Sequence, residues 1–140
     1  MNINIRARVR HLVQHHGTRN PIRIAKNVGI YIRYKKYSDF TKGYFIKIHN
    51  NKFIVINSKL CELEKRIVLA HELGHAILHN DKDIHFIKEH TLFPVGRFEV
   101  QANKFAAELL IADDEIRKDW TIPQISCWLG VPGELVKYKI

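Results

Sequence analysis

Residues 69–79 read LAHELGHAILH, and this stretch decides how the rest of the chain is interpreted. His71 and His75 are four residues apart with Glu72 directly after the first, in the H-E-x-x-H pattern. Residues four apart lie on the same face of a helix, so these two imidazoles could bind one tetrahedral Zn²⁺. Glu72 would then reach the open coordination position and accept a proton from water there. The alternative is a core helix that happens to contain histidines.

A catalytic zinc needs a third protein ligand, and Glu99 is the candidate. It lies 24 residues after His75, at the start of a second strongly helical segment, 98–111. Asn103 lies one turn further on the same face and could accept a hydrogen bond from a ligating histidine. His79 is expected beside the ligands or in the core rather than on the metal. Together the two helices predict a Zn²⁺ site more strongly than the short pattern alone.

The pattern around these helices predicts an α+β fold. Its sheet is expected to be small and antiparallel, with about three strands, packed on the helices that carry the zinc ligands; the strands are expected at 30–34, 44–49 and 52–57. Asn50-Asn51 separates the last two strands and suits a tight hairpin, because Asn tolerates positive φ. Residues 80–95 are expected to form a loop between the two metal-binding helices.

We expect one domain over residues 1–140. Its parts are N-terminal helices at 1–29, the sheet at 30–57, the metal-binding helices at 60–111 and a helical tail at 113–140. Asn20-Pro21 predicts the start of the second helix, as an N-cap followed by proline at the first helical position. Gly17 and Gly29 predict the ends of the first two helices.

Composition and charge limit the class of protein. With 46% hydrophobic and 26% charged residues and no long uncharged apolar run, the 140-residue chain predicts a soluble domain without a membrane span. The N-terminus lacks a signal-peptide pattern, and the two cysteines lack C-x-x-C spacing, which favours the cytoplasm. Residues 1–60 hold 13 Lys/Arg against one acid, whereas residues 61–140 hold 10 against 13. This asymmetry is compatible with a nucleic-acid partner and equally with a solvated basic face.

Two motifs together, LAHELGHAILH and FEVQANKFAAELLI (98–111), resemble the ImmA/IrrE metallopeptidases of bacteria and their mobile elements. The likeness extends over roughly residues 25–140. It implies that His71, His75 and Glu99 are zinc ligands and that Glu72 is the catalytic acid and base. It also implies an intracellular zinc endopeptidase that relieves repression by cleaving a partner helix-turn-helix repressor. The chain has LLIADDE where members often have LLMP, a departure that bears on substrate choice.

The tail at 121–140 has the outline of a helix-turn-helix, with Gly130 at the turn and Pro132 at the start of the second helix. Its charged set, Glu134, Lys137 and Lys139, is small for a DNA-reading helix, so a packing or repressor-docking role is favoured over DNA binding. The alternative to an enzyme is a zinc-containing regulator that binds DNA or a repressor without cleaving it. Glu72 favours the enzyme, because a structural zinc site needs no such carboxylate.

Overall fold

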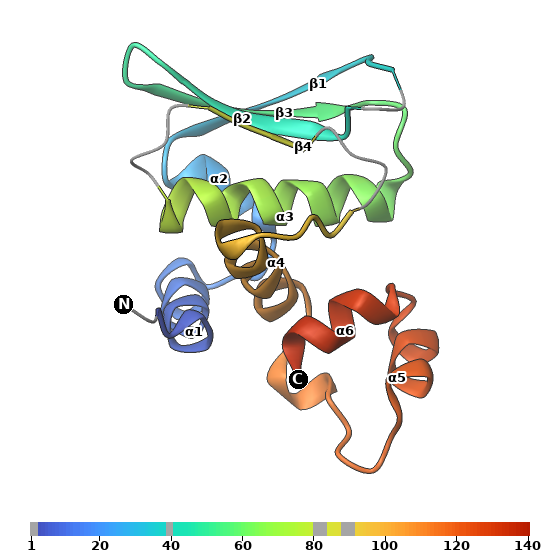
Figure 1. The fold of residues 1–140 in the computed structure, drawn as a ribbon. Coiled ribbons are helices and arrows are strands. Elements are labelled where there is room, and N and C mark those ends of the chain that lie inside the picture. The colour runs from blue at the N-terminus through green and yellow to red at the C-terminus, as the bar shows by residue number, and fades with distance from the viewer. Residues whose placement is uncertain (1–2, 39–40, 80–83, 88–91) are drawn as a thin grey trace.

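The computed structural model describes residues 3–38, 41–79, 84–87 and 92–140. Its elements confirm the predicted α+β class (Figure 1). In chain order they are α1 (Ile5–His16), α2 (Pro21–Asn27), β1 (Ile30–Lys35), β2 (Gly43–Ile48), β3 (Asn51–Asn57), α3 (Glu62–Leu78), β4 (Ile84–Ile87), α4 (Arg97–Leu110), the 3₁₀ helix η1 (Asp113–Glu115), α5 (Ile122–Leu129) and α6 (Gly133–Lys139).

The first two helices begin and end where the local sequence predicts. Gly17 ends α1 in the left-handed conformation, with φ of 68°, and its N–H donates to the Val13 carbonyl. The Asn20 side chain accepts a hydrogen bond from the Ile22 N–H, and Pro21 takes the first helical position of α2. Both boundaries follow from short-range chemistry.

The sheet corrects the prediction in its strand directions and in its number of strands. Its order is β1-β3-β2-β4, and β1 pairs with β3 in parallel, so the sheet is mixed rather than antiparallel. The link over residues 36–42 is too long for a tight hairpin. Strand β2 therefore does not have to pair with β1, and β3 pairs with β1 instead. Period-two alternation reports which face of a strand is buried and not which neighbour the strand pairs with.

The expected hairpin between β2 and β3 is present, with its turn one residue earlier than predicted. His49 and Asn50 have φ values of 49° and 67°, and Ile48 is opposite Asn51. Positive φ at both central residues characterises the two-residue type I′ turn. Asn51 is therefore the first residue of β3 rather than part of the turn.

The predicted loop over residues 80–95 is wrong in one part, because it contains β4. This strand of four residues pairs antiparallel with β2 and forms an edge of the sheet. Four residues are too few for a reliable periodic signal, which explains why the pattern did not reveal the strand. Residues 80–83 and 88–91 of the predicted loop lie outside the described residues.

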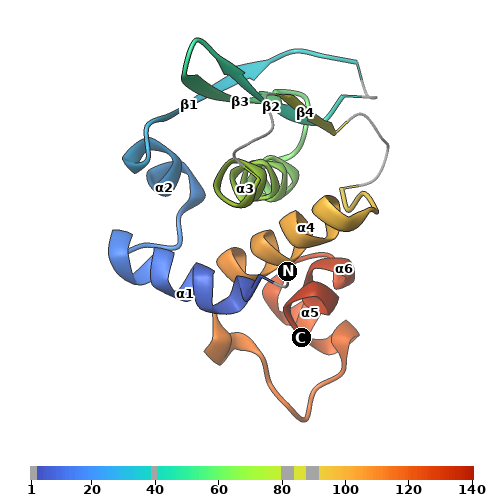
Figure 2. The same ribbon diagram turned by 60° about the vertical axis from the view of Figure 1, so that its left-hand side comes forward.

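Helix α3 lies against one face of the sheet and forms the centre of the core (Figures 1 and 2). Helix α4 crosses beneath α3 on the side away from the sheet. Gly74 is at this crossing, where a Cβ atom would lie 3.0–3.1 Å from the Phe105 side chain. The missing side chain at Gly74 therefore allows the two metal-binding helices to approach closely.

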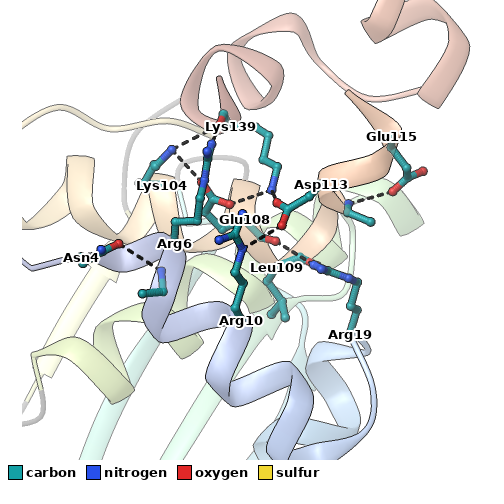
Figure 3. A network of polar contacts seen from close by, with 12 residues as sticks. Asn4, Arg6, Arg10, Arg19, Lys104, Glu108, Leu109, Asp113, Glu115 and Lys139 are labelled. Carbon is teal, nitrogen blue, oxygen red and sulfur yellow. Dashed lines mark hydrogen bonds and ion pairs between the residues drawn. The ribbon is translucent and has the colours of Figure 1, made fainter. Parts of the chain in front are cut away.

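The tail forms two short helices joined at Gly130, and α6 packs against α4. Lys139, which we expected on the charged face of this tail, is instead 2% exposed. Its Nζ lies 2.7 Å from Oε1 of the buried Glu108, and it also contacts Asp113 (Figure 3). The second helix is thus fixed to the body of the protein, which agrees with a packing role and removes one cation from any DNA-reading surface.

Glu108 is the centre of this charge cluster. Arg6 of α1 and Lys104 of α4 contact its Oε2 at 3.0 and 2.7 Å. Burial alone would raise the pKa of Glu108, but hydrogen bonds from Lys104, Lys139 and Arg6 outweigh it and lower the pKa. The cluster joins α1, α4 and α6 around one carboxylate.

A helix that crosses a membrane must be both long and apolar. In the part of the chain that the structure describes, no helix meets both requirements.

Candidate metal centre

The structure brings together the three residues that the sequence proposed as metal ligands. His71 and His75 project from α3, and Glu99 projects from the first turn of α4. The two histidine Nε2 atoms are 3.2 Å apart, and Glu99 Oε1 lies 3.3 Å from His71 Nε2 and 2.5 Å from His75 Nε2. Both imidazoles are buried, whereas the Glu99 side chain is 19% exposed. One nitrogen of each ring and one carboxylate oxygen therefore converge at a point with partial access to solvent.

The local backbone explains why Glu99 reaches the histidines. Gly96 precedes α4 with φ of 125°, a conformation that a side chain would strain. The helix then begins at Arg97, so Glu99 lies in its first turn, where the helix dipole favours a negative charge. The close crossing at Gly74 brings this turn against α3. Small alanines on α4, namely Ala102, Ala106 and Ala107, are fully buried and keep the helices close.

The donor set fits a zinc ion. Two imidazole nitrogens and one carboxylate are the ligands of one class of catalytic zinc site, which leaves a fourth position open. Ligand atoms about 2.0–2.2 Å from a tetrahedral zinc would be separated by roughly 3.4 Å. The separations of 3.3 Å between His71 Nε2 and Glu99 Oε1 and of 3.2 Å between the two Nε2 atoms agree with that value. The 2.5 Å between His75 Nε2 and Glu99 Oε1 is shorter. A cation between the three atoms would accept a lone pair from each of them.

Glu72 follows His71 on α3 and is fully buried, with 0% of its surface exposed. A carboxylate rarely occupies such a position unless it is paired or serves chemistry. Helical geometry places its Cβ one residue, or about 100°, around α3 from His71. This burial is compatible with a proton acceptor next to a metal.

A chain of hydrogen bonds leads away from His75, and its far end was not foreseen from the sequence. His75 Nδ1 lies 2.9 Å from His79 Nδ1, and His79 Nε2 lies 2.6 Å from Gln101 Oε1. The Gln101 oxygen is an acceptor, so His79 donates from Nε2 and accepts at Nδ1 from His75. This pattern leaves the lone pair of His75 on Nε2, which faces the other ligand atoms. His79 thus contacts His75, one of the candidate ligands.

Gln101 could have been found from its position, because it lies on α4 between the two residues that were singled out, Glu99 and Asn103. Its amide gives no metal-binding signal in a sequence, however, and its partner is 22 residues away. Phe98, also on α4, packs edge-on against His79 with ring centroids 4.7 Å apart. Both contacts hold the His79 ring in one orientation.

Asn103 was expected to accept a hydrogen bond from a ligating histidine. It is buried in the same region, and its Nδ2 donates to the Pro94 carbonyl at 2.9 Å. Its Oδ1 is buried and has no hydrogen-bond partner among the residues that the structure describes. The amide is therefore oriented by the loop before α4, with its oxygen available as an acceptor.

Comparison with known proteins gives three findings. Residues 25–123, more than half of the chain, match the family described as IrrE N-terminal-like domain, a family of peptidases. The chain is 38% identical to an uncharacterized immunity region protein 2 of Bacillus phage phi105, across 96% of this chain and 88% of that protein. It is 27% identical to the metallopeptidase ImmA of Bacillus subtilis strain 168, across 97% and 83% respectively. The family match ends at residue 123, whereas the alignments with the two relatives cover nearly all of the chain.

Proposed function

The chain belongs to the ImmA/IrrE family of IrrE N-terminal-like peptidases, and from this membership we propose that it is a zinc-dependent endopeptidase that cleaves a partner protein. The observation that carries the proposal is the convergence of His71, His75 and Glu99 on one point. The three ligand atoms lie within 4.8 Å of one another. We further propose that residues 1–140 act as one domain around this centre.

In the proposed mechanism His71, His75 and Glu99 hold the metal. A zinc ion there supplies Lewis acidity toward water and toward a peptide carbonyl. Glu72 accepts the proton of the water that attacks the carbonyl carbon, and the C–N bond then breaks as Glu72 passes this proton to the leaving amine. The chain's own residues thus provide the ligands and the proton carrier.

Neighbouring residues orient the ligands in this proposal. His79 and Gln101 fix the ring of His75 with its Nε2 lone pair directed at the metal. Asn103 offers its buried Oδ1 to an N–H of a ligating imidazole when the metal is bound. Support for this role is that a buried amide oxygen without a partner is costly unless another state of the site satisfies it.

The substrate that we propose is a helix-turn-helix transcriptional repressor. This choice comes from the resemblance to the ImmA/IrrE family, and it is supported by the phage relative, whose name places it in an immunity region. A cytoplasmic location is part of the same proposal, because a repressor acts there. The buried charge on α6 agrees with a tail that packs or docks a protein rather than one that reads DNA.

The test is co-expression with the repressor encoded nearest to the gene, followed by intact-mass measurement. Wild type is compared with Glu72→Gln, which keeps all three metal ligands. We expect a repressor fragment with wild type alone, and equal zinc in the two purified proteins by elemental analysis. An intact repressor with both proteins, each fully loaded with zinc and tested also in stress-treated cells, would instead support a regulator that binds without cleaving.

A further inference from the structure

One face of the sheet is left open by the fold. In both views of the ribbon, every helix lies on the same side of the four strands (Figures 1 and 2). Helix α3 covers the inner face, to which Phe45 and Ile54 contribute buried side chains. The outer face belongs to the alternate residues of β1, β2 and β3, and no described helix covers it.

The outer face presents aromatic rings next to one another. Tyr31 of β1 is opposite Phe53 of β3 in the register, and their rings are stacked with centroids 5.3 Å apart. Tyr31 is 47% exposed. Tyr44 and Ile46 of β2 continue the same face, since they are opposite Val55 and Phe53. The rings therefore form a platform on the sheet surface rather than part of the core.

The same face carries positive charge without negative charge. Arg33 lies over the Tyr31 ring at 5.6 Å from its centroid, and Lys35 follows on the same side of β1; both are exposed. The described strands contain no Asp or Glu, and residues 30–57 hold six Lys/Arg against one acid. An anionic partner therefore meets no opposing carboxylate on these strands.

A shallow hollow of about 310 Å³ lies on this face, next to the stacked Tyr31 and Phe53 rings and lined by the second of them. It is lined by Arg33, Lys35, Tyr44, Ile46, Ile48, Phe53 and Val55. The lining combines apolar and aromatic side chains with two cations. Proteins that bind single strands without reading a sequence combine stacking rings for the bases with cations for the phosphates.

We propose that the open face of the sheet binds single-stranded DNA, with bases against Tyr31 and Phe53 and phosphates at Arg33 and Lys35. DNA is favoured over RNA because the lining of the hollow is mostly apolar, and its one hydroxyl, that of Tyr44, is already hydrogen-bonded to the Tyr37 hydroxyl at 2.7 Å. A site that selects RNA needs groups that recognise the 2′-hydroxyl. This activity is separate from the metal centre, which lies on the opposite side of the sheet beneath α3.

The test uses fluorescence anisotropy with a short labelled oligothymidylate and the full-length protein. Tyr31→Ala should weaken binding roughly tenfold, because it removes a stacking surface, whereas Tyr31→Phe should bind as wild type does. The control is Trp128→Ala, which removes an aromatic ring of similar exposure, 48%, from α5. Circular dichroism and zinc content should be unchanged in all three variants.

The charge is tested by a matched pair of double variants. Arg33→Gln/Lys35→Gln should lower the slope of log affinity against log salt by about 1.4, since each phosphate contact contributes about 0.7 on a single strand. Lys118→Gln/Lys137→Gln makes the same change in net charge at exposed sites on the tail and should leave the slope unchanged.

Several results would overturn the proposal. These are an equal loss of slope in both double variants, a Tyr31→Ala variant that binds like wild type, and the absence of saturable binding by wild type. Tighter binding of a matched oligouridylate would overturn the choice of DNA. Sedimentation provides the last arm: a dimer that dissociates in Tyr31→Ala, without a change in DNA affinity, would assign the face to a second copy of the chain.

Discussion

Helix α4 carries two carboxylates that face the protein interior, one near each end, and their surroundings differ. Glu99 lies in the first turn beside His71 and His75, which are neutral donors of lone pairs when they bind a metal. Glu108 lies in the last turn and is surrounded by Arg6, Lys104 and Lys139. One carboxylate thus meets two imidazoles with which it could hold a metal ion, and the other meets cations supplied by the chain.

This difference separates a candidate metal site from a cluster of ion pairs. The Glu108 cluster is complete without any added ion, because three side-chain cations offset its burial (Figure 3). The Glu99 cluster brings together three groups that can each offer a lone pair to a metal ion. The comparison indicates that the type of partner, rather than burial alone, distinguishes the candidate metal-binding carboxylate from the one held in ion pairs.

The largest expected effect comes from exchanging each carboxylate for an amide. Glu99→Gln should remove zinc and abolish proteolysis, because a ligand is lost, while the metal-free fold remains. Glu108→Gln should keep zinc but lower the free energy of unfolding by about 3 kcal/mol, since Lys139 stays buried with less compensation. Elemental analysis and urea unfolding, both run on each variant, measure the two effects.

A further double variant tests the reason for the Glu108 effect. Glu108→Gln combined with Lys139→Met should recover part of the lost stability, because no cation is then left buried beside an amide. If the double variant were less stable than Glu108→Gln, the cluster would owe its contribution to packing and hydrogen bonds rather than to charge compensation. The contrast between the two ends of α4 would then be weaker.

A smaller effect is expected at the second layer of the metal centre. Gln101→Leu removes the acceptor for His79 and should weaken zinc affinity by roughly 10- to 100-fold, as measured by competition with a chromophoric chelator. Lys104→Leu is the control on the same helix, and it should lower stability without changing zinc affinity. Equal zinc affinity in wild type and Gln101→Leu would show that the hydrogen-bond chain does not position His75.

The smallest effect is a dependence of stability on acid. Hydrogen bonding from Lys139 lowers the pKa of Asp113 from 3.8 to about 2, against the opposing effect of burial, and Arg10 also contributes. A lowered folded pKa stabilises the protein above the unfolded pKa, and this contribution is lost as the pH falls through the folded value. Between pH 3.8 and about 2, Asp113→Asn should therefore lose less stability than wild type does in thermal melts. Parallel curves would contradict the assignment.

The features predicted correctly from sequence depend on residues close together in the chain. Asn20-Pro21 and Gly17 fix helix boundaries by short-range hydrogen bonds and φ, and the spacing of His71 and His75 follows from one helical turn. Glu99 could be identified from the sequence because it belongs to a second segment with helical periodicity. These local signals were sufficient for the fold class and for grouping the candidate ligands.

The features that were missed depend on pairs distant in sequence. Nothing in IYIRY distinguishes a parallel neighbour from an antiparallel one, and the partner of Lys139 lies 31 residues away. Gln101 was missed for the same reason, since its contact with His79 forms only when α3 and α4 have packed together. Lys139 was read as a surface charge because lysine is rarely buried unless it is paired, and pairing is a tertiary property.

The parallel pairing of β1 with β3 also has a consequence for the order of folding. The β2–β3 hairpin closes around His49 and Asn50 and needs no distant residue, so it can form within about 1–10 μs. Strand β1 must then find β3 with Ile30 opposite Lys52, a closure over a longer loop that forms more slowly. We therefore expect the β3 edge, next to apolar Ile54 and Ile56, to be open to pairing with another chain until β1 covers it.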